Sequence, residues 1–327
     1  MHFTIVEVIQ LAYNIPSMIF MLIVGILLLQ KILTESKAFQ NEFYPMFCYR
    51  IFNDVLYNIC ILLLLKFPSW LVMPQYFLHS VRISSIYYVF AASTFCVPFV
   101  HTIFLSAIRY VAIYHPMRYT RISSQRTSII LCSLLFLISF SIGLPTLAFP
   151  SMYIYSNYTN SVLPTYKVKS VAYYNFCYAI VFYGITVILS AIFNIANLVG
   201  LSRNNKKNNN KNKKSENVFA FYTFFTLFTT CLMEAYFCCR ISDNYLGNKT
   251  LLAIANYSVT WIGDLETFGN FYFLIFINTE IKAVIKETLY KVCKIKCNSS
   301  SSNTIKKKNI QDSKNSRCEK TTKTIVA

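Results

Sequence analysis

Charged side chains inside long apolar stretches are the residues of this chain whose types and spacing could do chemistry. Arg109 ends one such stretch, just before a basic loop that contains Arg118 and Arg121. Arg50 and Asp54 lie four residues apart in another stretch, so a helix would place them on one face. An ionised group in lipid needs a protein partner or a water-filled site. These residues therefore mark candidate binding or switching sites inside a membrane.

Three further acids and one histidine occupy apolar stretches. Glu234 lies near the outer end of its stretch, where it would meet a cationic or hydrogen-bonding ligand or pair with Arg82. Asp264 and Glu266 are two positions apart, about 200° around a helix, so they cannot share one face. One acid would then point to the centre of a bundle and the other to a neighbouring helix or the lipid boundary. His101 is expected to be a neutral, hydrogen-bonded packing residue.

The composition places these charges in a membrane protein. Of 327 residues, 55% are hydrophobic and only 13% are charged, which is unlike a soluble domain. Apolar runs of about 20 residues are typical of membrane-spanning helices. We expect an all-α, seven-transmembrane helix bundle over residues 1–295 and a disordered basic tail over residues 296–327. The predicted spans are residues 11–33, 45–65, 83–112, 128–149, 171–201, 218–239 and 251–277.

The placement of the basic residues predicts an orientation in the lipid bilayer. Only six of the 31 Lys and Arg residues fall on the side of the amino terminus. Because basic residues gather on the cytoplasmic side, we expect the amino terminus outside and the tail inside, in the plasma membrane. The net charge of +18 then reflects topology, and no nucleic acid is expected as a partner. The six outer residues are Lys66, Arg82, Lys167, Lys169, Arg240 and Lys249.

Modification motifs agree with this orientation. Asn157 and Asn248 each begin a sequon in a predicted outer loop, so both are candidate glycosylation sites. After the seventh span, apolar residues recur at helical spacing among lysines over residues 280–296, which predicts a short amphipathic eighth helix on the inner membrane surface. Cys293 and Cys297 are palmitoylation candidates, and unmodified cysteines fit the pattern equally well.

The inner loop between the fifth and sixth spans is rich in asparagine and lysine over residues 202–214. Such a polar, low-complexity sequence cannot bury enough apolar surface to fold by itself. We therefore expect this loop to be solvated and disordered.

Enzymatic function is not expected. A membrane-embedded hydrolase or hydroxylase needs clustered histidines or paired aspartates at helical spacing. The four histidines of this chain are scattered, and no such constellation is visible. We predict no catalytic residues, no metal site and no cofactor.

Three sequence blocks carry a resemblance to a known family. Phe43-Tyr44-Pro45 leads into the second predicted span, which contains Asn53-Asp54. Ile108-Arg109-Tyr110 lies at the end of the third span, and Pro116 follows it. The third block contains Asp264, Asn270, Phe276-Ile277-Asn278 and Ile281-Lys282. Together these blocks resemble the nematode serpentine chemoreceptors of the class-gamma superfamily (srg- and srv-like), a divergent branch of the rhodopsin-like G-protein-coupled receptors. The resemblance covers about residues 10–295.

This resemblance implies a chemosensory receptor. A small molecule would bind among the outer helix halves, and the receptor would signal to a heterotrimeric G protein. Arg109 and Tyr110, together with Arg118 and Arg121, would then engage the G-protein alpha subunit.

Two departures bear on the resting state that the resemblance implies. The acid that usually precedes this arginine is replaced by Ile108, so Glu216 at the base of the sixth span is the candidate resting-state partner of Arg109. Glu216 belonging to the disordered loop is the alternative. In rhodopsin-like receptors an aspartate near the position of Asp54 helps to hold sodium; a local pair with Arg50 is the other interpretation.

The outer loop after the fourth span is a further departure. Rhodopsin-like receptors usually tie this loop to the outer end of the third helix by a disulfide. Residues 150–170 contain no cysteine, so that bridge cannot form here.

A ligand-gated cation channel with seven spans is the alternative function. Such a channel of the insect odorant-receptor type has its amino terminus inside the cell. The distribution of Lys and Arg argues against that orientation.

Overall fold

The computed structural model describes residues 5–34, 39, 41–122, 124–156, 161–207, 213–246 and 249–291. Contacts divide the chain into two compact units, Met1–Asn278 and Thr279–Ala327. The predicted boundary between residues 295 and 296 lies outside the described residues. So do four predicted modification sites, which are Asn157, Asn248, Cys293 and Cys297.

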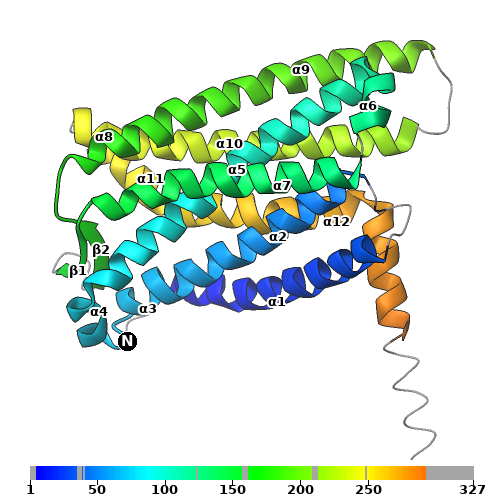
Figure 1. Ribbon diagram of the computed structural model, residues 1–327. Coiled ribbons are helices and arrows are strands. Elements are labelled where there is room, and N and C mark those ends of the chain that lie inside the picture. Colours follow the sequence, from blue (N-terminus) through cyan, green and yellow to red (C-terminus); the bar gives the residue numbers. More distant parts are fainter. Residues whose placement is uncertain are drawn as a thin grey trace, which may run out of the picture. The chain divides into compact units, whose positions relative to one another are not determined.

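Long helices running side by side form the first unit (Figure 1). Six single helices among the described residues are long and apolar enough to cross a membrane, and Ser258–Ile277 passes the same test together with Thr279–Lys291. The all-α bundle predicted from the apolar stretches is therefore confirmed. The spans are built from α1 (Ile5–Leu33), α2 (Phe43–Cys60) with η2 (Ile61–Lys66) and α3 (Phe67–Ser69), α5 (Val81–Tyr114), α7 (Gln125–Gly143) with η3 (Leu144–Ala148), α8 (Val171–Phe176) with η4 (Cys177–Phe182) and α9 (Tyr183–Lys207), α10 (Lys213–Leu246), and α11 (Lys249–Asp264) with η5 (Leu265–Gly269) and α12 (Asn270–Ile277).

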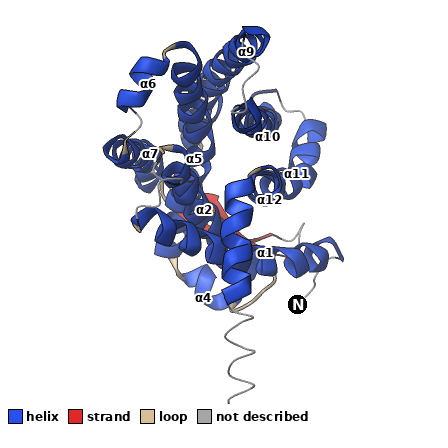
Figure 2. Cartoon of the chain, turned by 90° about the vertical axis from the view of Figure 1, so that its right-hand side faces the viewer, coloured by secondary structure: helices blue, strands red, loops and turns tan. Residues whose placement is uncertain are grey.

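Helix α5 has the widest set of neighbours, because it packs against α2, α7, α9 and α10. Figure 2 views the helices nearly end-on and shows them grouped as a bundle. Two glycines allow close crossings with α5. A Cβ added to Gly143 of α7 would lie 2.7 Å from the carbonyl oxygen of Val89, and one added to Gly200 of α9 would lie 2.6 Å from Ile113. Larger residues at either glycine would push α5 away.

The inner ends of α9 and α10 correct one prediction. Helix α9 continues to Lys207 and α10 begins at Lys213, so both enter the loop predicted to be disordered over residues 202–214. Extending an existing helix fixes one residue for each new hydrogen bond, and lysine is a good helix former. The polar composition therefore marks the end of the membrane span but not the end of the helix. Residues 208–212 lie outside the described part.

Three spans contain a π-helical segment, a rare geometry that often marks functional positions. These segments are η2, η4 and η5. They carry Lys66, Tyr178 and Glu266 respectively, and each of these side chains contributes to a polar contact described below. The hydrophobic pattern did not predict them, because a single wide turn barely changes the spacing of apolar residues.

The outer loop after α7 forms a hairpin that the sequence analysis does not predict. Strand β1 (Ser151–Ser156) pairs antiparallel with β2 (Ser161–Tyr166). Tyr153 and Val162 are buried against Phe77 of the short helix α4 (Pro74–His79). The hydroxyl of Tyr153 donates to the carbonyl oxygen of Leu64 at 2.6 Å. Burial raises the pKa of Tyr153, so this hydroxyl keeps its proton and its role as donor.

The second unit contains a helix over Thr279–Lys291. Ile281 and Val284 are buried, whereas Lys286 is exposed. Glu287 and Lys291 form an ion pair one turn apart at 2.6 Å. The predicted amphipathic eighth helix is therefore confirmed as far as Lys291, where the described residues end.

Candidate functional site

A buried charge cluster joins the second and seventh spans at the centre of the bundle. Arg50 is 1% exposed, and its Nε lies 3.0 Å from Oδ2 of Asp54, one turn later in α2. Its Nη2 lies 2.7 Å from Oε1 of Glu266 and 3.0 Å from the carbonyl oxygen of the same residue. Glu266 lies in the π-helical segment η5, where its carbonyl oxygen and its Oε1 both face Arg50 of α2. One arginine thus links two carboxylates, and we refer to Arg50, Asp54 and Glu266 as the polar core.

The polar core shows the local pair that was one of two interpretations of Asp54. The guanidinium of Arg50 lies where a sodium ion would have to bind Asp54. Sequence reasoning missed Glu266 as the third member, because a contact between residues 216 positions apart leaves no local pattern. A small pocket adjoins the core, lined by Asp54, Glu266 and Pro98 among others.

Asp264 points away from the polar core. Its carboxylate accepts hydrogen bonds from Tyr13 and, at 3.4 Å, from Gln10, both in α1. Two acids separated by one residue therefore serve two interfaces, as their rotation around the helix requires. Glu266 binds α2 and Asp264 binds α1.

His101 corrects a prediction. It is fully buried in α5, as expected of a packing residue, but neither ring nitrogen has a hydrogen-bond partner among the described residues. Other polar groups of α5, one to two turns further along, form hydrogen bonds with α9. Ser106 accepts a hydrogen bond on Oγ from Asn194 at 2.7 Å and on its carbonyl oxygen from Asn197 at 3.0 Å. The burial of His101 could be predicted from its apolar stretch. The sequence did not indicate that Ser106, rather than His101, would form hydrogen bonds with a neighbouring helix.

Asn270 ties the polar core to the sixth span. Its side-chain amide donates to the hydroxyl of Thr229 in α10 at 3.0 Å and to the carbonyl oxygen of Glu266 at 2.7 Å. The polar core is thereby in contact with α2, the seventh span and α10. A change in α10 would reach the core through this amide.

The predicted coupling residues lie at the inner end of α5. The guanidinium of Arg109 stands 4.0 Å from the ring centroid of Phe219 in α10 and 5.8 Å from that of Phe43 in α2, within cation–π range. Tyr110 packs against Tyr114 and against Phe193 of α9. Arg109 therefore contacts α2, which carries Arg50 and Asp54, and α10, which Asn270 links to the polar core.

Two further coupling candidates, Arg118 and Arg121, lie on the short helix that follows α5. Arg118 is exposed on the short helix α6 (Pro116–Ile122). Arg121 lies on the same helix, and Glu216 lies in the first turn of α10, but both of these side chains fall outside the described residues. The predicted pair between Arg109 and Glu216 stays a prediction.

Glu234 lies in α10 opposite Gly184 of α9, where a Cβ on that glycine would be 3.5 Å from Oε1. Its Oε2 is buried and has no hydrogen-bond partner among the described residues. Arg82, the alternative partner, is exposed at the start of α5, and no ion pair between these two described residues is present. The contact of Glu234 with a ligand stays a prediction.

An aromatic cluster lies at the outer end of the bundle, around a residue that sequence reasoning did not single out. Arg240 of α10 donates through Nη1 to the hydroxyl of Tyr236 at 2.8 Å. Tyr87 of α5 and Tyr178 of η4 lie within electrostatic range of the same guanidinium. Nearby, Tyr88 of α5 stacks on Tyr166 of β2 with ring centroids 3.8 Å apart. The sequence placed Arg240 only among the outer charges, because the aromatic side chains around it come from separate spans.

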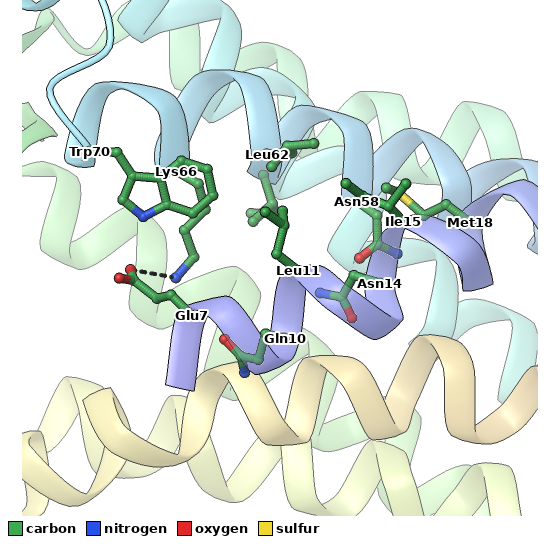
Figure 3. Close-up of a pocket in the computed structure, with 11 residues that line it drawn as sticks. Glu7, Gln10, Leu11, Asn14, Ile15, Met18, Asn58, Leu62, Lys66 and Trp70 are labelled. Carbon is green, nitrogen blue, oxygen red and sulfur yellow. Dashed lines mark hydrogen bonds and ion pairs between the residues drawn. The ribbon is translucent and has the colours of Figure 1, made fainter. Parts of the chain in front are cut away.

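A further pocket lies between α1 and the segment formed by α2 and η2. Figure 3 shows Glu7 and Lys66 at one end, beside Trp70, and Asn14 and Asn58 at the other. The ion pair between Glu7 and Lys66 measures 3.4 Å. Neither Glu234 nor His101 lines this pocket.

Comparison with known families identifies a match over nearly all of the described spans. The model of the family described as serpentine type 7TM GPCR chemoreceptor Srv matches residues 10–291. No curated protein matches the chain.

Proposed function

The chain belongs to the Srv family of serpentine seven-transmembrane chemoreceptors, and from this premise we propose that it binds a small molecule among its outer helix halves and signals to a heterotrimeric G protein. The family is one of multi-pass membrane receptors and is not an enzyme family. The observation that carries the proposal is a set of three separate polar contacts along one helix. They are the contact of Arg240 with Tyr236, the contact of the polar core with Thr229 through Asn270, and the contact of Arg109 with Phe219.

Helix α10 connects the three parts. It carries Arg240 at its outer end, Thr229 beside the polar core and Phe219 under Arg109. A ligand that binds one arrangement of α10 more tightly than another would shift the population toward that arrangement. The shift would change the contact between Phe219 and Arg109 at the inner face, where a G protein would bind.

The receptor function is tested by a second-messenger assay. Cells that express the full-length protein are exposed to a panel of small organic acids, esters, amines and alcohols. We expect at least one compound to raise the second messenger, and we expect the response to disappear in cells that lack G-protein alpha subunits. A ligand-gated current that persists in those cells would favour the alternative, a cation channel.

The orientation proposed for the plasma membrane has its own test. Only six of the 31 basic residues lie on the side of the amino terminus, which predicts that an amino-terminal tag is stained on intact cells, whereas a tail tag is stained only after permeabilisation. An amide-cleaving glycosidase should also shift the mobility of the wild type but not of the Asn157→Gln/Asn248→Gln variant. An amino-terminal tag that needs permeabilisation would overturn the orientation and favour the channel.

A further inference from the structure

The outer end of α10 presents a cation with unused hydrogen-bonding capacity. Arg240 is exposed. An arginine has five N–H donors in a fixed planar fork, and the hydroxyl of Tyr236 uses one of them. Tyr87 and Tyr178, from two other elements, lie within electrostatic range of the guanidinium. We call these four residues the arginine–tyrosine cluster.

No carboxylate among the described residues forms an ion pair with Arg240. The ion pairs of the described chain belong to Arg50, Lys66 and Lys291. Glu234 precedes Arg240 by six residues, which is about 240° around α10, so the two side chains face different neighbours. A guanidinium at the edge of a membrane is stabilised by a partner of opposite charge. An anion from outside would supply that partner.

The surroundings of Arg240 define the rest of the ligand. The stacked and only partly buried rings of Tyr88 and Tyr166 lie at the same end of the bundle, with their centroids 3.8 Å apart. These rings favour an apolar or aromatic body. A single arginine matches the one charge of a carboxylate, which it binds through two parallel hydrogen bonds. A phosphate monoester carries close to two charges and would leave one unbalanced.

We propose that the arginine–tyrosine cluster binds the carboxylate of a small organic acid, whose apolar body packs on the neighbouring aromatic rings. The inference rests on the proposed function, because the cluster then serves as the ligand site of the receptor. Arg240 supplies the charge, and the tyrosine hydroxyls orient the carboxylate. A cationic ligand, which Glu234 alone would suggest, is disfavoured at this cluster.

Matched compounds test the charge. Cells expressing the full-length receptor are exposed to benzoate, phenylacetate and hexanoate, each beside its methyl ester and an amine of similar size. We expect acids to act at lower concentrations than their esters. In Arg240→Gln, the half-maximal concentration of the active acid should rise by about 30-fold or more, the usual cost of removing one side of a charge pair. Arg240→Lys should fall between the two.

Controls separate this proposal from the receptor function. Arg82→Gln removes another exposed outer arginine and should respond like the wild type at equal surface levels. Thermal stability of purified full-length receptor in lipid discs gives a readout without signalling, and benzoate should stabilise the wild type more than Arg240→Gln. Stabilisation without any cellular response would support the acid site and contradict the proposed signalling.

Three results would overturn the acid site. The first is a response to esters or amines alone, which would leave the receptor function intact. The second is an unchanged acid response in Arg240→Gln. The third is the absence of both an acid response and stabilisation by benzoate.

Discussion

Replacing Arg109 with alanine is expected to reduce ligand-evoked signalling to the level of cells without the receptor, at normal surface expression. The guanidinium lies over Phe219 of α10 and near Phe43 of α2, at the inner mouth of the bundle. Alanine removes both the charge that would meet the G protein and the contact that would sense α10. Second-messenger output normalised to surface receptor measures the effect.

Arg126→Ala is the control, because Arg126 is an exposed basic residue at the start of α7 that carries the same charge outside the aromatic contact of Arg109. It should signal normally. Glu216→Gln should raise ligand-independent signalling if Glu216 holds Arg109 at rest. Unchanged basal activity in Glu216→Gln beside a silent Arg109→Ala would refute the lock and keep the coupling role. Normal signalling by Arg109→Ala would refute the coupling role itself.

The polar core gives the second large effect, on stability. Arg50→Met leaves Asp54 and Glu266 buried without their shared cation, and breaking one side of a buried ion pair costs about 3–5 kcal/mol. We expect most of this variant to be retained inside the cell as unfolded receptor. Glu266→Gln leaves the positive charge of Arg50 paired with the negative charge of Asp54. This variant should therefore lose much less mature surface receptor than Arg50→Met.

A variant with an uncharged core is the control for the predicted difference between Arg50→Met and Glu266→Gln. Combining Arg50→Met with Asp54→Asn and Glu266→Gln removes all three charges and should recover much of the surface receptor that Arg50→Met loses. Glycosidase-resistant surface protein and thermal denaturation of purified receptor provide two independent measures. Equal loss in Arg50→Met and Glu266→Gln would show that packing, rather than charge balance, sets the stability of the core.

The spans could be predicted from the sequence because lipid imposes a length and an apolar composition on every crossing helix. The residues 83–112 predicted for the third span lie within α5, which runs from Val81 to Tyr114. The ends could not be placed as well, since a helix continues into water for as long as its backbone hydrogen bonds favour it. The hairpin of β1 and β2 was missed because it is stabilised by Phe77 and Leu64, which come from a different part of the chain.

Contacts between distant parts of the chain also limit what the sequence could predict of the candidate sites. The four-residue spacing of Arg50 and Asp54 is local, and it indicated their pair correctly. Glu266 and the tyrosines around Arg240 become neighbours only when the spans pack, so no sequence spacing indicates them. His101 shows the converse case: its burial follows from its apolar stretch, but the expected hydrogen bond does not form.

The outer hairpin has a consequence for the conditions under which the receptor works. Its position depends on strand pairing, on the packing of Tyr153 and Val162, and on one hydroxyl bond to Leu64. The cysteines in the described chain are all free thiols. A reducing agent breaks sulfur–sulfur bonds but leaves hydrogen bonds and apolar contacts intact. The hairpin should therefore keep its position on Phe77 and Leu64 in millimolar dithiothreitol.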